Sequence, residues 1–230
     1  MMFELPSLIV FILVVVAAGV LMIQAAPQHK QWVTRVLGFL ILAQSGAAFS
    51  GFYLQSQTLP PRFILAVLPS LLIIAALFFL KKGKDFLNGL DLRFLLMIHF
   101  LRIPVEWCLY DLYQQAMIPE IMTFEGRNFD ILIGITAIII YLITYTFRRY
   151  SRVLLITWNI IGMIFLLNIV VHAILSVQSP IQQFGFDQPN RAVLEYPFVL
   201  LPSVVVPLVM LSHLATLRKL ILNSNSNAPL

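Results

Sequence analysis

The amino-acid sequence predicts an all-α, polytopic membrane protein with seven transmembrane helices. The first observation is composition, because 60% of the 230 residues are hydrophobic and only 11% are charged. An ordinary soluble domain carries roughly 25% charged residues, so these few charged side chains cannot coat a water-facing surface. The second observation is that the apolar residues occur in long runs. The third is that basic residues gather in every second loop between those runs. The first partner we predict is therefore the lipid bilayer.

Seven apolar runs are long enough, or nearly so, to cross a hydrocarbon core of about 30 Å at 1.5 Å per residue. The first three and the sixth are free of charged side chains, and the fifth has 17 uncharged residues. The fourth holds three charged residues, but without it a basic loop and an acidic loop would lie on the same side. Two prolines interrupt the seventh. The predicted helices are Leu5–Ala26, Val36–Tyr53, Phe63–Leu80, Phe94–Met117, Ile131–Phe147, Val153–Val177 and Tyr196–Leu217. They form one domain, residues 1–222, followed by a short polar tail, residues 223–230.

The basic residues predict how the chain is threaded, because lysine and arginine close to helix ends resist translocation. Eleven of the fifteen lie in alternate loops on one side, and only Arg62, Arg127 and Arg191 lie on the other. This places the N-terminus outside and the C-terminus in the cytoplasm. Because the sequence contains no Asn-x-Ser/Thr sequon, it fits a bacterial chain, and we expect a multi-pass protein of the cytoplasmic (inner) membrane.

The positions of the basic residues, the cysteine and the histidines argue against several partners and cofactors. The basic clusters follow topology and form no basic stripe with interleaved aromatics, so we expect no nucleic-acid partner. A single cysteine, Cys108, excludes an intramolecular disulfide and a cysteine-based metal site. His172 lies near the outer end of its predicted helix, whereas His99 and His213 lie in the inner parts of theirs, so the three cannot share one metal shell. We expect no metal centre and no cofactor, and the sequence leaves a haem held by His99 and His213 open.

The fourth predicted helix carries a polar stripe inside the bilayer. His99, Arg102, Glu106 and Tyr110 follow one another at spacings of three and four residues, which puts them on one helix face. An ionisable residue at mid-membrane costs about 2.5 to more than 10 kcal/mol, so it is a functional-site hypothesis by default. Arg102 and Glu106 are one turn apart and can pair, and Pro104 predicts a kink. The stripe indicates a solute or proton site, or an ion pair that fixes helix packing.

Two other predicted helices face this stripe. Asn168 and His172 share a face of the sixth helix, and His213 lies in the inner part of the seventh, where it can pair with His99. A second group lies at the outer ends of the helices and predicts an outer mouth. Its members are Asp111, Glu125, Arg127, Asp130 and Glu195.

The loop residues of that mouth also have a structural interpretation. Asn128 suits a helix N-cap, and Asp130 would then lie in the first helical turn, where an acid is favoured. Arg127 would pair with Glu125 or Asp130.

Three segments carry a resemblance to a known family: Arg102-Ile-Pro-Val-Glu106, Met122-Thr-Phe-Glu-Gly-Arg-Asn-Phe-Asp-Ile131 and Leu211-Ser-His-Leu-Ala-Thr-Leu-Arg218. They are similar to a family of uncharacterised bacterial seven-helix membrane proteins. The resemblance implies an all-helical inner-membrane protein and brings no activity with it. A retinal protein is excluded because the seventh predicted helix has no lysine. A ceramidase-like zinc amidase would need a paired-histidine motif there, and only His213 is present.

The predicted function is binding or transport of a small polar or amphiphilic solute through a polar cavity lined by the fourth, sixth and seventh helices. In this hypothesis Arg102 attracts an anionic group, Glu106 titrates or balances Arg102, and His99 relays protons. One alternative is a membrane-embedded enzyme that modifies a lipid, with or without a metal ion, in which Glu106 or Glu195 is the acid/base and a histidine is the base or a metal ligand. Another is a structural or assembly subunit whose polar groups lock helix packing. The predicted partners are a small solute or lipid, and the sequence leaves a homo-oligomer open.

Overall fold

A computed structural model describes residues 3–149 and 151–222, and over those residues the protein is all helical, with no strand. Four helices are long and apolar enough to cross a membrane: Leu5–Ala25, Lys30–Phe49, Arg152–Leu175 and Leu201–Leu222. A fifth is added if the bent pair Ile64–Phe79 and Lys81–Asn88 is one span. These helices have the length and composition of membrane-spanning helices. The predicted tail, residues 223–230, lies outside the described part.

The described residues form nine α-helices and six short helical segments. The α-helices are α1 (Leu5–Ala25), α2 (Lys30–Phe49), α3 (Ile64–Phe79), α4 (Lys81–Asn88), α5 (Leu92–Ile98), α6 (Arg102–Gln114), α7 (Asp130–Tyr141), α8 (Arg152–Leu175) and α9 (Val206–Leu222). The short 3₁₀ segments are η1 (Phe52–Leu54), η2 (His99–Leu101), η3 (Glu120–Met122) and η5 (Ala192–Leu194). Two π-helical segments are η4 (Leu142–Thr146) and η6 (Leu201–Val205).

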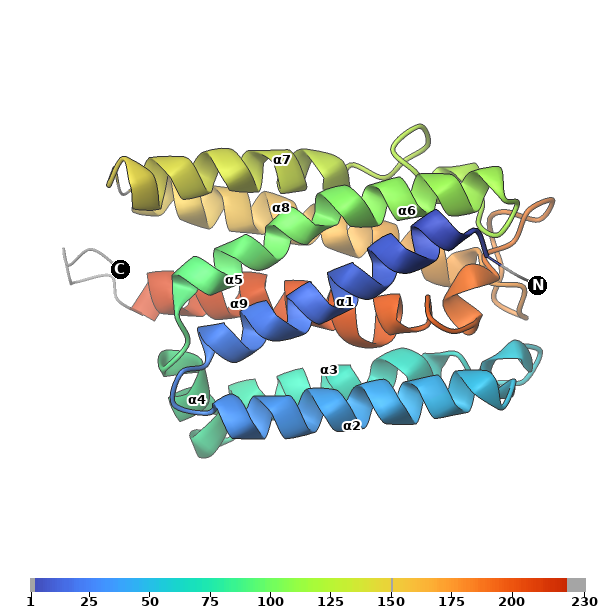
Figure 1. Ribbon diagram of the computed structural model, residues 1–230, viewed down its shortest axis with the longest axis horizontal. Coiled ribbons are helices and arrows are strands. Elements are labelled where there is room, and N and C mark those ends of the chain that lie inside the picture. The colour runs from blue at the N-terminus through green and yellow to red at the C-terminus, as the bar shows by residue number, and fades with distance from the viewer. Residues whose placement is uncertain (1–2, 150, 223–230) are drawn as a thin grey trace.

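The long helices run side by side along one axis, as Figure 1 shows. The start of α1 and the end of α9 lie at opposite ends of the bundle (Figure 1). α2 and α3 form one side of it, α7 and α8 the other, and α1, α5, α6 and α9 lie between them (Figure 1). α1 contacts α5 and α6, and α9 contacts α5 and α8. The middle of the bundle is thus built from α1, α5, α6 and α9.

The predicted fourth helix, Phe94–Met117, is observed as three consecutive segments, α5, η2 and α6. Pro104 has no amide hydrogen, so it cannot donate to the carbonyl of Phe100 one turn earlier. The helix tightens to 3₁₀ geometry over 99–101, within that turn. The proline therefore changes the helix at the point where the polar stripe begins.

The boundaries of two other predicted helices were wrong. α2 begins at Lys30, six residues before the predicted start, and the last helical segment covers Leu201–Leu222 in place of Tyr196–Leu217. A search for uncharged runs stops at lysine and arginine, but these residues are good helix formers and extend helices beyond the hydrocarbon. Before η6, buried Phe198 and Val199 continue the apolar run without being helical.

α4 has no counterpart among the predicted helices. It is bent by 89° from α3 and is amphipathic, with Phe86 and Leu87 buried and its lysines exposed. Gly83 allows α4 to fold back onto α3, since a Cβ at this position would lie 2.4 Å from the Cα of Leu77. α4 lies at the end of the bundle where α9 ends (Figure 1).

A serine pair joins α3 to η6. Pro207 lacks an amide hydrogen and so cannot donate to the carbonyl of Ser203. The hydroxyl of Ser70 donates a hydrogen bond of 2.5 Å to this carbonyl, and both serines are buried. The carbonyl that Pro207 leaves without a backbone donor thus receives a hydrogen bond from the neighbouring helix α3.

Candidate functional site

Arg102 is the centre of a polar cluster inside the bundle. Only 3% of the residue is exposed, and each guanidinium nitrogen faces a different helix. Nε lies 3.2 Å from Oδ2 of Asp130 on α7, Nη2 donates to the carbonyl of Gly162 on α8 at 3.2 Å, and Nη1 lies 3.4 Å from Nε2 of His213 on α9. The arginine of α6 therefore holds together α7, α8 and α9.

Two glycines create the space for this arginine. A Cβ on Gly162 would lie 2.5 Å from Cε1 of His213, and a Cβ on Gly134 would lie 2.8 Å from Cγ1 of Ile103. Both contacts are closer than real Cβ atoms tolerate, so α8 and α7 approach the cluster only because these positions carry no side chain. The carbonyl of Gly162 becomes accessible to Arg102 for the same reason.

His99 and His213 form a stacked pair next to Arg102. Their ring centroids are 4.0 Å apart with an angle of 31° between the planes, and Trp158 packs against both rings. Because a guanidinium can only donate hydrogen bonds, Nε2 of His213 must accept from Arg102. The proton of His213 is then on Nδ1, which donates to Oδ1 of Asn159 at 2.8 Å. The structure thus places His99 next to His213, the pair that the sequence suggested.

Asn128 connects the two acids of the cluster. Its amide nitrogen donates to Oε1 of Glu106 at 2.6 Å and to the carbonyl of Met122 at 3.1 Å. Its amide oxygen accepts from the backbone N–H of Asp130 at 3.0 Å. The side chain therefore accepts from a free backbone N–H in the first turn of α7, as an N-cap would. It also holds the carboxylate of Glu106 in place.

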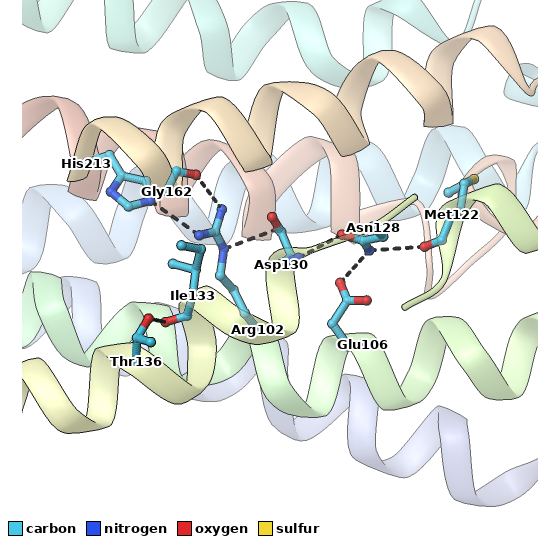
Figure 2. A network of polar contacts seen from close by, with 9 residues as sticks. All are labelled: Arg102, Glu106, Met122, Asn128, Asp130, Ile133, Thr136, Gly162 and His213. Atoms are coloured by element: carbon cyan, nitrogen blue, oxygen red, sulfur yellow. Dashed lines mark hydrogen bonds and ion pairs between the residues drawn. The ribbon is translucent and has the colours of Figure 1, made fainter. Parts of the chain in front are cut away.

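The side chains form a row along the bundle, which Figure 2 shows from His213 through Arg102, Asp130 and Asn128 to Glu106 and Met122. Each neighbour is linked by a hydrogen bond or an ion pair. With His99 stacked on His213, we call this set the polar chain; its members are His99, His213, Arg102, Asp130, Asn128 and Glu106.

The ion pair of Arg102 differs from the predicted one. The sequence suggested Glu106, one helical turn away, whereas the structure pairs Arg102 with Asp130 at 3.2 Å. Glu106 turns toward Asn128. The suggested pairing of Arg127 with Asp130 was wrong for the same reason, since Asp130 is 5% exposed and faces inward. Asp130 therefore belongs to the polar chain and not to an outer mouth.

The remaining predicted residues make separate local contacts nearer the loops. Asn168 donates to the carbonyl of Arg127 at 2.7 Å, and Nδ1 of His172 lies 2.8 Å from the carbonyl of Asn168. Tyr110 stacks on Phe124 with centroids 4.9 Å apart.

The predicted outer-mouth residues also lie away from the polar chain. Asp111 accepts from Gln115 at 2.6 Å. Glu125 and Arg127 are exposed, and Glu195 is half-buried before η6. The structure does not bring these residues, or Tyr110, Asn168 and His172, into the polar chain.

A small cavity of about 10 Å³ reaches the histidine end of the polar chain. His99, Asn159, Tyr145 and Thr216 line it together with apolar side chains. A space of about 10–15 Å³ is what one water molecule needs. Within the described residues, Nδ1 of His99 is buried and has no hydrogen-bond partner. The cavity is therefore large enough for one water molecule beside His99.

The acid end of the polar chain also has unused polar atoms. Over the described part of the chain, Oε2 of Glu106 and Oδ1 of Asp130 are buried without a hydrogen-bond partner. Two buried acids face one buried arginine, and only Asp130 is in contact with it. Glu106 has an amide for its partner, so with both acids ionised the acid end would carry one more negative than positive charge.

Sequence reasoning missed four contributors to this site: Asn128, Trp158, Asn159 and Gly162. Asn128 was interpreted only as a cap, and nothing in the spacing of Asn159 or Gly162 indicates which helix they face. The usable signal was the position of Asn159 inside an apolar run, where a polar side chain needs a partner. Among the described residues, no group of three His, Cys, Asp or Glu side chains is placed to hold a metal ion.

Comparisons with known proteins give the chain a family. A family profile described as Domain of unknown function (DUF8737) matches residues 59–221, which include the whole polar chain. No curated protein and no solved structure matches the chain. The matched part covers well over half of the sequence. The chain therefore belongs to the DUF8737 family of unknown function.

Proposed function

We propose that this chain is a seven-span protein of a bacterial cytoplasmic membrane that binds or moves a small polar or amphiphilic solute together with protons. The observation that carries the proposal is the polar chain. It is buried and continuous, its members come from η2, α6, α7 with the loop before it, and α9, and it has ionisable side chains at both ends. Ionisable residues in such positions line ion and proton pathways in membrane proteins.

The three remaining spans are supported by shorter helices. Residues 92–114 form three consecutive helical segments that would extend about 34 Å at 1.5 Å per residue. Residues Asp130–Thr146 form a shorter apolar helix next to them. With α3, these segments add three spans to the four long helices. An odd number of crossings agrees with the start of α1 and the end of α9 lying at opposite ends (Figure 1).

The orientation is supported by charge. The end of the bundle with α4 and the last turn of α9 carries eleven lysines and arginines, and the opposite end carries three. By the positive-inside rule the basic end would face the cytoplasm. The N-terminus would then be outside, as the sequence predicts.

The polar chain suggests a division of roles. The guanidinium of Arg102 is engaged by Asp130, Gly162 and His213, so it would organise the site and not hold a free anion. Glu106, whose partner is an amide, is the acid best placed to gain and lose a proton. His99 would receive protons from the small cavity beside it.

Proton movement in liposomes tests this proposal. The protein would be reconstituted with a pH-sensitive dye inside, and carboxylic acids, amino acids and sugars would be added outside one at a time. We expect at least one of these to drive proton movement. Glu106→Gln should reduce that movement at least ten-fold, because the amide cannot exchange a proton. Glu120→Gln, which changes an exposed acid outside the polar chain, is the matched control and should leave it unchanged.

A second variant separates transport from a purely structural role of the polar chain. Removing both partners of a buried ion pair is often close to neutral for stability, whereas removing one costs about 3–5 kcal/mol. Arg102→Met combined with Asp130→Leu should therefore fold but move no protons. If Glu106→Gln or this double variant is folded and moves protons at the normal rate with every solute that drives the normal protein, the transport proposal fails and a packing role remains.

A further inference from the structure

The side of the bundle away from the polar chain contains an apolar groove. One cavity, of about 60 Å³, lies between α2, α3 and the η6–α9 segment. A second, of about 360 Å³, lies between α2, α3 and α4. The two cavities share Trp32, Ile73, Leu77 and Phe86 in their walls, so they are parts of one groove.

The deep part of this groove is entirely apolar apart from Ser70. α2 contributes residues from Trp32 to Leu40, a distance of about 12 Å along the helix. Ile74, Leu208 and Leu211 close it from α3 and α9. A narrow apolar groove of this kind fits a hydrocarbon chain and offers nothing to a polar solute.

The mouth of the groove has the opposite character. His29 and Lys82 are the polar side chains in its wall, next to an aromatic cluster in which Phe86 contacts His29 and Trp32, with ring centroids 5.5 and 5.2 Å apart. Trp32 is 44% exposed. An exposed tryptophan beside a lysine is typical of a membrane–water interface.

Charge at the mouth selects the kind of lipid. α4 carries Lys81, Lys82 and Lys84, all exposed, against a single acid, Asp85. The 89° bend between α3 and α4 turns this helix across the end of α3, and Lys82 lies in the wall of the mouth. Basic pockets between transmembrane helices bind anionic lipid headgroups.

We infer that this groove is a binding site for one anionic phospholipid, with an acyl chain between α2, α3 and α9 and the phosphate beside Lys82 and His29. The site shares no residue with the polar chain. It does not depend on the transport proposal, because it needs only that the chain lies in a bilayer.

Native mass spectrometry of the purified protein in detergent tests the inference. Phosphatidylglycerol and phosphatidylcholine with the same acyl chains would be added in equal amounts. We expect one phosphatidylglycerol to be retained in preference to phosphatidylcholine. Lys82→Gln should lower its occupancy about five-fold, which corresponds to the approximately 1 kcal/mol contributed by one lysine near anionic lipid. Lys84→Gln removes the same charge from the same helix outside the groove wall, and should change occupancy less than two-fold.

A second variant tests the groove itself. Ala76 is exposed in the wall of the larger cavity, so Ala76→Trp should fill the groove and prevent binding of either lipid. Fluorescence provides a readout that needs no groove variant. In a Trp107→Phe protein, dibromo-phosphatidylglycerol should quench Trp32 more strongly than dibromo-phosphatidylcholine, while buried Trp158 gives a constant background.

The inference is overturned if the two lipids are held equally and Lys82→Gln behaves as Lys84→Gln does. It is also overturned if a folded Ala76→Trp protein retains phosphatidylglycerol as before, or if the groove is found to hold a second copy of this chain. Equal quenching by the two brominated lipids would contradict it independently.

Discussion

At the scale of single residues, the absence of a side chain at Gly162 decides whether the polar chain can form. Its carbonyl accepts from Arg102 at 3.2 Å, and His213 packs where a Cβ would be. A bulkier residue would push the histidine away from both Arg102 and Asn159. A glycine inside a helix usually lowers the stability of that helix by about 1 kcal/mol relative to alanine. Here it is required by the packing of three helices.

We therefore expect Gly162→Ala to destabilise the protein by about 1–3 kcal/mol, the range typical of overpacking. The measurement is the midpoint of thermal unfolding in detergent, followed by circular dichroism. Gly38→Ala is the matched control, because a Cβ on Gly38 meets nothing within 4 Å and α2 gains a better helix former. The packing argument fails if Gly162→Ala is as stable as Gly38→Ala.

The partner of Arg102 shows what sequence reasoning can and cannot find at this scale. The spacing of His99, Arg102 and Glu106 predicted one buried face, and all three residues are buried. The spacing could not find Asp130, because contacts between helices depend on how each helix is rotated and tilted. Glu106 was the partner nearest in sequence, whereas the partner in space comes from α7.

At the scale of elements, two prolines alter helices, and each altered segment is next to a site. Pro104 follows the 3₁₀ turn at His99, and Pro207 follows the π-helical η6. The sequence predicted both interruptions, because proline in a helix removes a donor. It could not predict that Ser70 from α3 would satisfy the carbonyl of Ser203. α4 was missed because the helix is only eight residues long and only Phe86 and Leu87 form its apolar face.

The hydrogen bond from Ser70 should matter only because Pro207 leaves the Ser203 carbonyl without its usual donor. Ser70→Ala should lower stability by about 1–3 kcal/mol, since it leaves a buried acceptor unsatisfied. In a Pro207→Ala background the same change should be smaller, because the substituted alanine provides a backbone N–H for that carbonyl. Unfolding midpoints of the four proteins give the coupling between the two sites. Strictly additive effects would contradict this account.

At the scale of the whole molecule, composition and charge predicted the class of protein better than any motif predicted its chemistry. The apolar fraction predicted a helical membrane protein, and the helices described agree with it. Each of the seven predicted runs contains a helical segment, although the ends of α2 and of the last segment are displaced. The family profile adds membership and no activity, so the proposed function depends on the polar chain.

The orientation of the bundle can be measured directly. With Cys108 replaced by alanine, the chain has no cysteine, so single cysteines can be introduced at exposed Glu125 and Lys84. We expect a membrane-impermeant maleimide to label Glu125→Cys in intact cells, and Lys84→Cys only after the membrane is opened. The reverse pattern would place the basic end outside, against the positive-inside rule. Labelling of both positions in intact cells would contradict a fixed orientation.

The pairing of Arg102 with Asp130 also has a consequence for biosynthesis. The two residues are on the consecutive α-helices α6 and α7, so a ribosome making roughly 5–20 residues per second would expose them a few seconds apart. Until α7 emerges, Arg102 would enter lipid without its partner Asp130, at a cost of about 2.5–3.5 kcal/mol. We therefore expect residues 92–114 to wait at the translocon and to leave it together with α7 as a helical hairpin.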